Sequence, residues 1–330
     1  MMKLVDTPDN PAPEGGTIAF IEAADGVRLR TAMFMPEAPA HGTVLLATGR
    51  AETIEKYFET IRELLARNLA VVIFDWRGQG LSARLLRAAD KGHIADFAHY
   101  QRDLDAVLAK VFVPHAPKPW FALGHSMGGA ILLEHAHRQA SPFERMVLCA
   151  PMIDLVLTWP RLARFAAHAL HAIGLGRAYV PSGRREPIVV RGFERNPLTT
   201  DRFRFDRLTK MVCSEQRLSL GDPTIGWAHA AFRQMARFAD PDYPRTIHTP
   251  LLVFAPQDDW VTDSFAAERF CARVKIARLI WMPGARHEIL MERDTIRARF
   301  WAGFDAFVPG SVQEVPAADQ ALADSGVEEA

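Results

Sequence analysis

Gly124-His125-Ser126-Met127-Gly128-Gly129 follows an apolar run at 120–123 and precedes a second apolar run that begins at Ala130. The stretch has the form G-x-S-x-G between an expected strand and an expected helix. A glycine two residues to either side of Ser126 lets the chain turn sharply without a Cβ clash. Such a turn lifts the serine hydroxyl above a sheet edge and sets a helix N-terminus beside it. The stretch therefore predicts a nucleophilic serine in an α/β fold.

Short apolar runs alternate with helical patterns on both sides of this turn. Strands are expected at 43–47, 70–74, 120–123, 146–149, 251–254 and 278–282, and helices at 55–67, 96–112, 128–139, 264–274 and 292–307. Before them, 17–21 and 27–34 are typical of an antiparallel pair. This alternation indicates an α/β fold, a mostly parallel central sheet with helices on both faces.

One long segment interrupts the alternation. Residues 152–246 have helical patches and loops, which predicts an inserted, mainly helical cap between two parts of one core, 17–151 and 247–309. Residues 1–16 are expected to form a flexible N-terminal tail. The segment 310–330 has five acidic residues and no lysine or arginine, and is expected to be a disordered acidic tail.

The composition excludes several classes of partner and site. Lys+Arg and Asp+Glu each number 39, which argues against nucleic acid as a partner. The three cysteines are far apart and predict neither disulfides nor a metal site. No apolar run has transmembrane length, and the N-terminus lacks the apolar segment of a signal peptide. We expect a cytoplasmic protein, at most peripheral at the inner face of the membrane.

A serine nucleophile needs a base, and the base needs an acid to orient it. In this type of fold the acid and then the base follow the serine, each on a loop after a strand. His287 follows the strand at 278–282 and is the only histidine after His248, so it is the expected base. Asp258 and Asp259 follow the strand at 251–254. Only one of them can face His287, and the residues alone leave that choice open.

Several motifs together resemble one family. The matching stretches are Thr48-Gly49-Arg50-Ala51-Glu52 with Lys56-Tyr57, the run 75–82, the serine turn 124–129, the cap runs 196–201 and 221–224, and the acid and base loops. The chain resembles the α/β-hydrolase superfamily, and within it the bacterial lysophospholipase L2 and monoacylglycerol lipase group. The resemblance spans roughly residues 17–307.

The resemblance implies roles for individual residues. The acid loop of similar proteins reads Asp, any residue, an apolar residue, any residue, Asp, which selects Asp259. The oxyanion hole would take backbone N–H groups from Met127 and from Arg50. The Arg50 side chain could meet a phosphate or lie in solvent, and we favour solvent.

The function implied is that of a serine hydrolase of lipid carboxylic esters, with an acyl-enzyme on Ser126. Lysophospholipase activity is favoured, with monoacylglycerol lipase or general carboxylesterase activity as alternatives. An acyltransferase with the same triad is a further alternative, and a non-catalytic binding protein would be expected to lack a triad member. The reaction needs no metal and no organic cofactor. The expected partner is a lipid or small ester.

The cap contains a basic amphipathic segment, because residues 155–185 include no acid. On a helix over 159–173, arginines and histidines share one arc and apolar residues another. Trp159, Leu162 and Phe165 are the candidate substrate contacts. One interpretation is that this helix touches an anionic membrane or admits an acyl chain with its phosphate. The favoured interpretation is that its apolar side packs over the active site.

Overall fold

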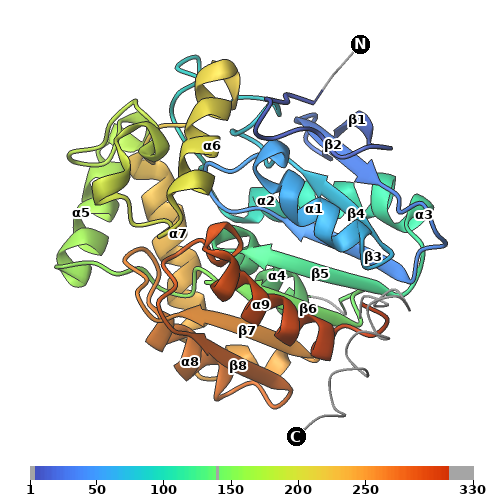
Figure 1. Ribbon diagram of the computed structural model, residues 1–330. Coiled ribbons are helices and arrows are strands. Elements are labelled where there is room, and N and C mark those ends of the chain that lie inside the picture. The colour runs from blue at the N-terminus through green and yellow to red at the C-terminus, as the bar shows by residue number, and fades with distance from the viewer. Residues whose placement is uncertain (1–3, 139–140, 312–330) are drawn as a thin grey trace, which may run out of the picture.

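A computed structural model describes residues 4–138 and 141–311, and its centre is a mixed sheet (Figure 1). The strand order is β1-β2-β4-β3-β5-β6-β7-β8, with β1 and β2 antiparallel to their neighbours and the others parallel. The strands are β1 Thr17–Glu22, β2 Arg28–Phe34, β3 Gly42–Ala47, β4 Leu69–Phe74, β5 Trp120–His125, β6 Arg145–Cys149, β7 Leu251–Pro256 and β8 Ala277–Met282.

Helices cover both faces of the sheet (Figure 1). They are α1 Phe58–Leu65, α2 Ala98–Val107, α3 Val113–His115, α4 Met127–Arg138, α5 Pro160–Ala172, α6 Arg202–Ser214, α7 Ile225–Phe238, α8 Ser264–Cys271 and α9 Asp294–Phe307. Successive side chains of a strand point to opposite faces. Leu45 therefore joins the core with α2, α4 and α8, while Leu46 joins the core with α1 and α9.

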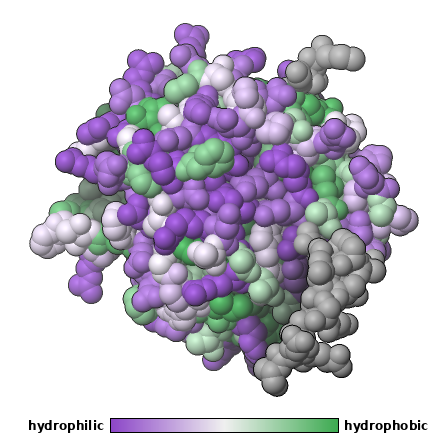
Figure 2. Space-filling model, viewed as in Figure 1, coloured by the Kyte–Doolittle hydropathy of each residue, from purple (hydrophilic) through white to green (hydrophobic). Residues whose placement is uncertain are grey.

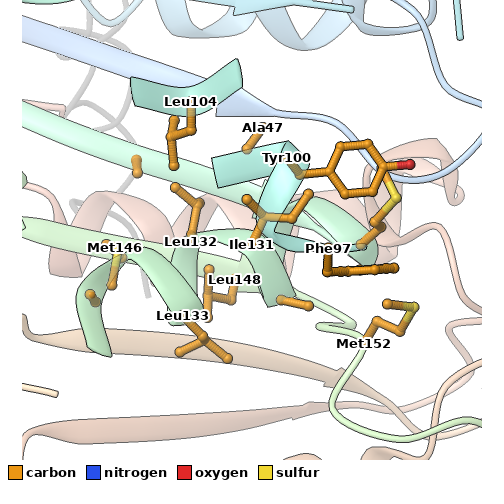
Figure 3. Packing of buried hydrophobic residues seen from close by; sticks show 14 of the residues in the cluster. Ala47, Phe97, Tyr100, Leu104, Ile131, Leu132, Leu133, Met146, Leu148 and Met152 are labelled. Carbon is orange, nitrogen blue, oxygen red and sulfur yellow. The ribbon is translucent and has the colours of Figure 1, made fainter. Parts of the chain in front are cut away.

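The first of these cores lies beneath the serine turn. Figure 3 shows Ile131 and Leu132 of α4 near Leu148 of β6 and Leu104 of α2. All four side chains are fully buried, and buried aliphatic side chains of this size stabilise a fold by about 1.5–3 kcal/mol each. Helix α4 is thus held against the sheet along its length, which keeps its first turn in place.

The predicted α/β fold class is confirmed, with differences at the bounds of some elements. The helix expected at 128–139 begins at Met127, directly after the serine. The helix expected at 96–112 ends its α-helical part at Val107 and continues as a π-helical turn over Leu108–Phe112.

The expectation of a loose N-terminal tail is wrong for residues 4–16. Leu4 is buried in the core beside α1 and α9, and Asn10 Nδ2 donates to the Glu55 carbonyl at 2.9 Å. An apolar anchor and a buried amide offset the disorder that the Pro-rich composition favours. Of the expected acidic tail, residues 312–330 lie outside the described part of the chain.

The segment between β6 and β7 adds no strand to the sheet within the described residues. It carries α5, α6 and α7, which Figure 1 shows beyond the carboxyl ends of the central strands. The cap bounds of 152–246 stay a prediction. In the described ranges, no helix has both the length and the hydropathy to cross a bilayer.

Candidate active site

Ser126 sits on a strained turn between β5 and α4. Its φ is 49°, in the left-handed region that residues with a Cβ rarely adopt. Its N–H donates to the Cys149 carbonyl at 3.0 Å, and its carbonyl accepts from Met152 N at 3.0 Å. A Cβ at Gly128 would lie 2.1 Å from the Ala47 carbonyl oxygen. Glycine is required at 128 because α4 starts in contact with the end of β3.

The structure brings Ser126, His287 and Asp259 together in one hydrogen-bonded chain. His287 Nδ1 lies 2.9 Å from Asp259 Oδ2, and His287 Nε2 lies 3.0 Å from Ser126 Oγ. In the tautomer that carries its proton on Nδ1, His287 donates a hydrogen bond to Asp259, and its Nε2 accepts a hydrogen bond from the serine hydroxyl. These are the contacts that a serine nucleophile, its base and an orienting acid require.

The turn after β7 separates the two aspartates. Asp259 Oδ1 accepts from Val261 N at 2.7 Å and from Thr262 N at 3.0 Å, and its Oδ2 accepts from Thr262 Oγ1 at 2.7 Å. These bonds bend the loop so that the Asp259 carboxylate is fully buried against His287. Asp258 is exposed, and Asp263 is the residue that caps α8. Asp258 is therefore solvated and does not cap a helix.

His287 and Asp259 each favour the charged form of the other. Burial opposes protonation of His287, but the Asp259 carboxylate and its hydrogen bond, helped by Glu288 and Glu52, raise the histidine pKa above 6.5. Burial likewise opposes ionisation of Asp259, and His287 with the Thr262 and Val261 donors lowers the aspartate pKa below 3.8. The carboxylate is thus ionised and can stabilise an imidazolium.

A buried ionic network lies directly beneath the triad. Glu52 Oε1 is 2.7 Å from both Lys56 Nζ and His125 Nδ1, and Glu52 Oε2 accepts from Tyr57 Oη at 2.6 Å. Lys56 Nζ also contacts Glu288 Oε1 at 2.6 Å. Burial opposes ionisation of Glu52, but His125 and Lys56 hold its pKa well below 4.5. Five polar side chains thus compensate one another where water is excluded.

This network contacts one triad residue and the loop before Arg50. His125 Nε2 lies 3.2 Å from the His287 carbonyl oxygen, and Gly49 N donates to Glu52 Oε2. Gln79 Nε2 donates to the Gly49 carbonyl at 2.9 Å, which further fixes the loop before Arg50. The sequence reasoning assigned these residues no role. The signal was the i,i+4 pair of Glu52 and Lys56 within the family-like stretch 48–57.

The two expected oxyanion donors come from neighbouring backbone segments. Met127 is the first residue of α4, so its N–H has no acceptor within the helix. The close approach of Gly128 to Ala47 brings this turn against the loop that follows β3. Arg50, on that loop, lines the same cavity as Ser126. Their role as donors to a tetrahedral oxyanion stays a prediction.

A cavity of about 280 Å³ opens above Ser126 and His287. Its wall is mostly apolar and comes largely from the segment between β6 and β7. The lining residues from that segment are Met152, Leu155, Pro187, Ile188, Val189, Leu198, Leu208, Met211, Val212, Leu218, Leu220, Gly221, Asp222, Pro223 and Trp227. Among the described residues, no group of His, Cys, Asp and Glu side chains is arranged to hold a metal ion.

The three candidate substrate contacts do not line this cavity. Trp159 and Leu162 line a second apolar cavity, between α5 and α7, whereas Phe165 lines neither. Their contact with substrate stays a prediction. Trp159, Leu162 and Phe165 are 71%, 62% and 68% exposed. Helix α5 packs on α7 through its small and histidine side chains: Ala167 is its buried residue, and His171 stacks on His229 at 4.5 Å. Leu170 is half-buried and lines the cavity between the two helices, whereas Leu162 and Phe165 remain largely exposed.

The favoured expectation for the Arg50 side chain is also wrong. Arg50 is partly buried, and its Nη2 donates to the Gly221 carbonyl in the cap. The guanidinium lies 5.4 Å from the centre of the Trp227 ring. The Arg50 side chain therefore reaches from the core loop to the cap along the cavity wall. The loop alone would leave this side chain in water, but the cap covers it.

Comparisons with known proteins agree with this geometry. The family model described as serine aminopeptidase, S33, matches residues 38–294. The chain is 30% identical to lysophospholipase L2 of Escherichia coli strain K12 over 275 residues, 77% of this chain and 76% of that protein. It is 26% identical to probable lysophospholipase L2 of Haemophilus influenzae over 265 residues, 80% and 83% of the two chains.

Solved structures show the same fold. A soluble variant of monoglyceride lipase from Saccharomyces cerevisiae, in complex with a substrate analogue, aligns with a TM-score of 0.72 at 20% identity. The alignment covers 91% of this chain and 98% of that one. At this identity the likeness extends to the fold alone.

Proposed function

Because this chain belongs to the serine aminopeptidase S33 family of α/β hydrolases, we propose that it hydrolyses carboxylic esters of lipids, with lysophospholipids preferred. The observation that carries the proposal is the Ser126–His287–Asp259 hydrogen-bonded chain at the floor of an apolar cavity. The lysophospholipase L2 relatives support the substrate class.

The reaction follows from the contacts of each side chain. Ser126 Oγ attacks the ester carbonyl carbon while His287 Nε2 takes the hydroxyl proton. The resulting oxyanion accepts from the Met127 and Arg50 N–H groups, and each such donor contributes about 10²–10³ in rate. His287 then protonates the leaving glycerol oxygen. The glycerol with its phosphate headgroup is released, and the acyl group stays on Ser126.

The second half of the reaction reverses these roles. His287 removes a proton from water, the hydroxide attacks the acyl carbonyl, and the proton returns to Ser126 as the fatty acid leaves. Asp259 stays ionised throughout and stabilises the imidazolium. A glycerolipid alcohol in place of water would give acyl transfer through the same groups.

A second apolar cavity supports the proposal that the substrate carries a long acyl chain. It has a volume of about 480 Å³, lies between α5 and α7, and shares Leu155, Pro223 and Trp227 with the catalytic cavity. A hydrocarbon chain gains about 0.8 kcal/mol for each methylene that it buries. An ester with a long chain would therefore gain affinity that a short ester cannot.

Labelling with a fluorophosphonate tests the nucleophile. The parent protein is expected to be labelled and Ser126→Ala to remain unlabelled, and labelling that survives the substitution rejects the assignment. A panel of lysophospholipids, monoacylglycerols and short esters, with free fatty acid and transferred acyl product both measured, then ranks the substrates. Preference for short neutral esters would reject the lysophospholipase proposal.

We also propose that α5 touches an anionic lipid surface. Trp159, Leu162, Phe165 and Ile173 are exposed on it, with Arg161 between them. Figure 2 is largely hydrophilic, and paler or hydrophobic residues lie at its left edge, where Figure 1 places α5. An apolar surface with a cation and no acid suits an anionic bilayer interface. Binding to vesicles of anionic phospholipid that weakens with salt supports this, and equal binding to neutral vesicles opposes it.

A further inference from the structure

The Arg50 guanidinium is a cation in the catalytic cavity that lacks a carboxylate partner. Its Nη2 donates to the neutral Gly221 carbonyl, and its Nε is buried without any hydrogen-bond partner in residues 4–138 and 141–311. Among the residues that the structure describes, no carboxylate oxygen lies within ion-pair distance of Arg50. Burial lowers the pKa of Arg50 to about 10, so the group is still charged at neutral pH.

The acid whose charge favours the protonated form of Arg50, Asp222, is already occupied by other groups. Asp222 Oδ1 is paired with Arg191 Nη2 at 2.9 Å, and Asp222 Oδ2 accepts from Arg184 N at 2.8 Å. Both oxygens of this carboxylate are therefore used within the cap. Asp222 still favours the charged form of Arg50 through its field, although burial has the larger effect.

The other cation in the cavity wall is fully compensated. Lys56 Nζ contacts Glu52 at 2.7 Å and Glu288 at 2.6 Å, one on each side. Lys56 thus belongs to the network under the triad and has no charge to offer to a ligand. Arg50 differs from it in lining the cavity without an anionic partner among the described residues. A partly buried cation in this position costs stability unless an anion arrives.

We propose that the Arg50 side chain binds the phosphate of the lysophospholipid substrate. This assignment rests on the proposed function, because it places the phosphate relative to an ester held at Ser126. Guanidinium groups bind phosphate oxygens through parallel N–H donors. The two Nη groups would supply that fork, with the Gly221 carbonyl holding its orientation.

One substrate molecule can contact both the backbone N–H and the guanidinium of Arg50. The backbone N–H of Arg50 is an expected donor to the ester oxyanion, while its side chain extends toward Gly221 and Trp227. In a lysophospholipid, only the glycerol carbons separate the scissile ester from the phosphate. The same residue can therefore hold the carbonyl oxygen through its main chain and the headgroup through its side chain. A monoacylglycerol has the ester but lacks the phosphate.

The first experiment measures substrate preference. A lysophosphatidylcholine and a monoacylglycerol with the same short acyl chain, both below their micelle concentrations, are compared by kcat/KM. The ratio of the two values cancels any effect of the substitution on the oxyanion hole. Arg50→Gln is expected to lower the ratio by about tenfold or more, because a charged hydrogen bond to phosphate is lost. Arg50→Lys should restore part of it.

The control is Arg299→Gln, which removes the same charge at an exposed position of α9 away from the cavity. Its substrate ratio should match that of the parent protein. A ratio that falls equally in Arg299→Gln, or that stays within about twofold in Arg50→Gln, overturns the proposal. If neither substrate is hydrolysed by the parent protein, the proposed function fails instead, and the binding experiment decides about Arg50.

The second experiment uses Ser126→Ala, which keeps Arg50 intact and removes turnover. Calorimetry compares an alkylphosphocholine with an uncharged alkyl glycerol ether of the same chain length. Tighter binding of the phosphate ligand, by about tenfold, supports the proposal, and equal binding overturns it. Inorganic phosphate is a third ligand. If it alone blocks binding of the alkylphosphocholine at similar concentration, the site takes free phosphate, and the headgroup assignment is overturned.

Discussion

The triad and helix α5 are held in place in opposite ways. The Asp259 and His287 side chains are 0% and 5% exposed, and each is fixed by several hydrogen bonds from loops at strand ends. Trp159 and Phe165 of α5 are 71% and 68% exposed, and Ala167 is the buried residue of that helix. Several hydrogen bonds fix each catalytic side chain, whereas few contacts fix the exposed side chains of the outer cap surface. Substitutions in the two regions should therefore affect different steps.

The largest effect is expected from Asp259→Asn. The amide leaves the size of the side chain unchanged but cannot stabilise the imidazolium or select the correct tautomer, so kcat should fall by about 10⁴. Steady-state hydrolysis of a soluble ester measures this loss. Asp258→Asn is the matched control, because Asp258 is exposed and one residue away, and its kcat should stay within about twofold. The opposite result would move the acid to Asp258.

The next effect, on stability, is expected from Glu52→Gln. The substitution removes the charge that compensates Lys56 and His125, and breaking such a buried network costs about 3 kcal/mol. Urea unfolding measures the change in the free energy of unfolding. Asp206→Asn, in an exposed pair with Arg202, should leave the free energy of unfolding nearly unchanged. Similar losses in both variants would mean that the network under the triad adds no special stability.

Glu52 also predicts a dependence of stability on pH. Its folded-state pKa lies well below 4.5, so the folded protein binds fewer protons than the unfolded chain near that pH. The stability from Glu52 is present above pH 4.5 and is lost as the pH falls toward the folded-state pKa. Glu52→Gln should reduce this acid sensitivity in the same unfolding experiments, and an unchanged pH slope would contradict the assignment.

A smaller effect is expected from Glu288→Gln on the pH profile of catalysis. His287 must be neutral to accept the serine proton, so kcat/KM should rise with pH through a pKa above 6.5. Glu288 is one of the acids that raise that pKa, and its removal also leaves the Lys56 charge less compensated. The acid limb should therefore shift to lower pH. A shift to higher pH would show that Glu288 does not act on His287 through its charge.

The smallest effect on chemistry is expected on α5. The double substitution Phe165→Ser and Ile173→Ser removes exposed apolar surface outside both cavities, so hydrolysis of a soluble ester should stay within about twofold. Binding to anionic vesicles should weaken by about tenfold, because two exposed apolar side chains are lost. Co-sedimentation with vesicles measures the binding. Loss of soluble-ester activity with unchanged vesicle binding would mean that α5 serves catalysis and not contact with the lipid surface.

Much of the fold was readable from periodicity and glycine placement. The strand and helix expected around Ser126 occur within a few residues of their predicted bounds, because a buried parallel strand and an amphipathic helix leave strong local patterns. The loops with His287 and Asp259 were readable from chain order. The network of Glu52, Lys56 and Glu288 was not, since partners far apart in the chain meet only after the sheet forms.

The exposure of large apolar side chains on α5 was missed for a similar reason. A helix with one basic and one apolar arc allows either arc to face the core, and local pattern favours burying the apolar one. Here the histidine arc meets His229 of α7, and Trp159 and Leu162 remain largely exposed at the edge of the second cavity. Arg50 was misjudged because its loop, taken alone, is a surface turn.

The sequence by itself determined the α/β fold, the serine turn and the loops that supply its base and acid. These depend on local turns and on short periodic patterns, which neighbouring residues specify. Only the tertiary structure decided that the turn after β7 buries Asp259 and exposes Asp258, that the Arg50 guanidinium spans to the cap, and that Leu162 and Phe165 of α5 stay exposed. Each of these outcomes depends on which distant surface covers a residue, and burial of that kind is a property of the packed chain.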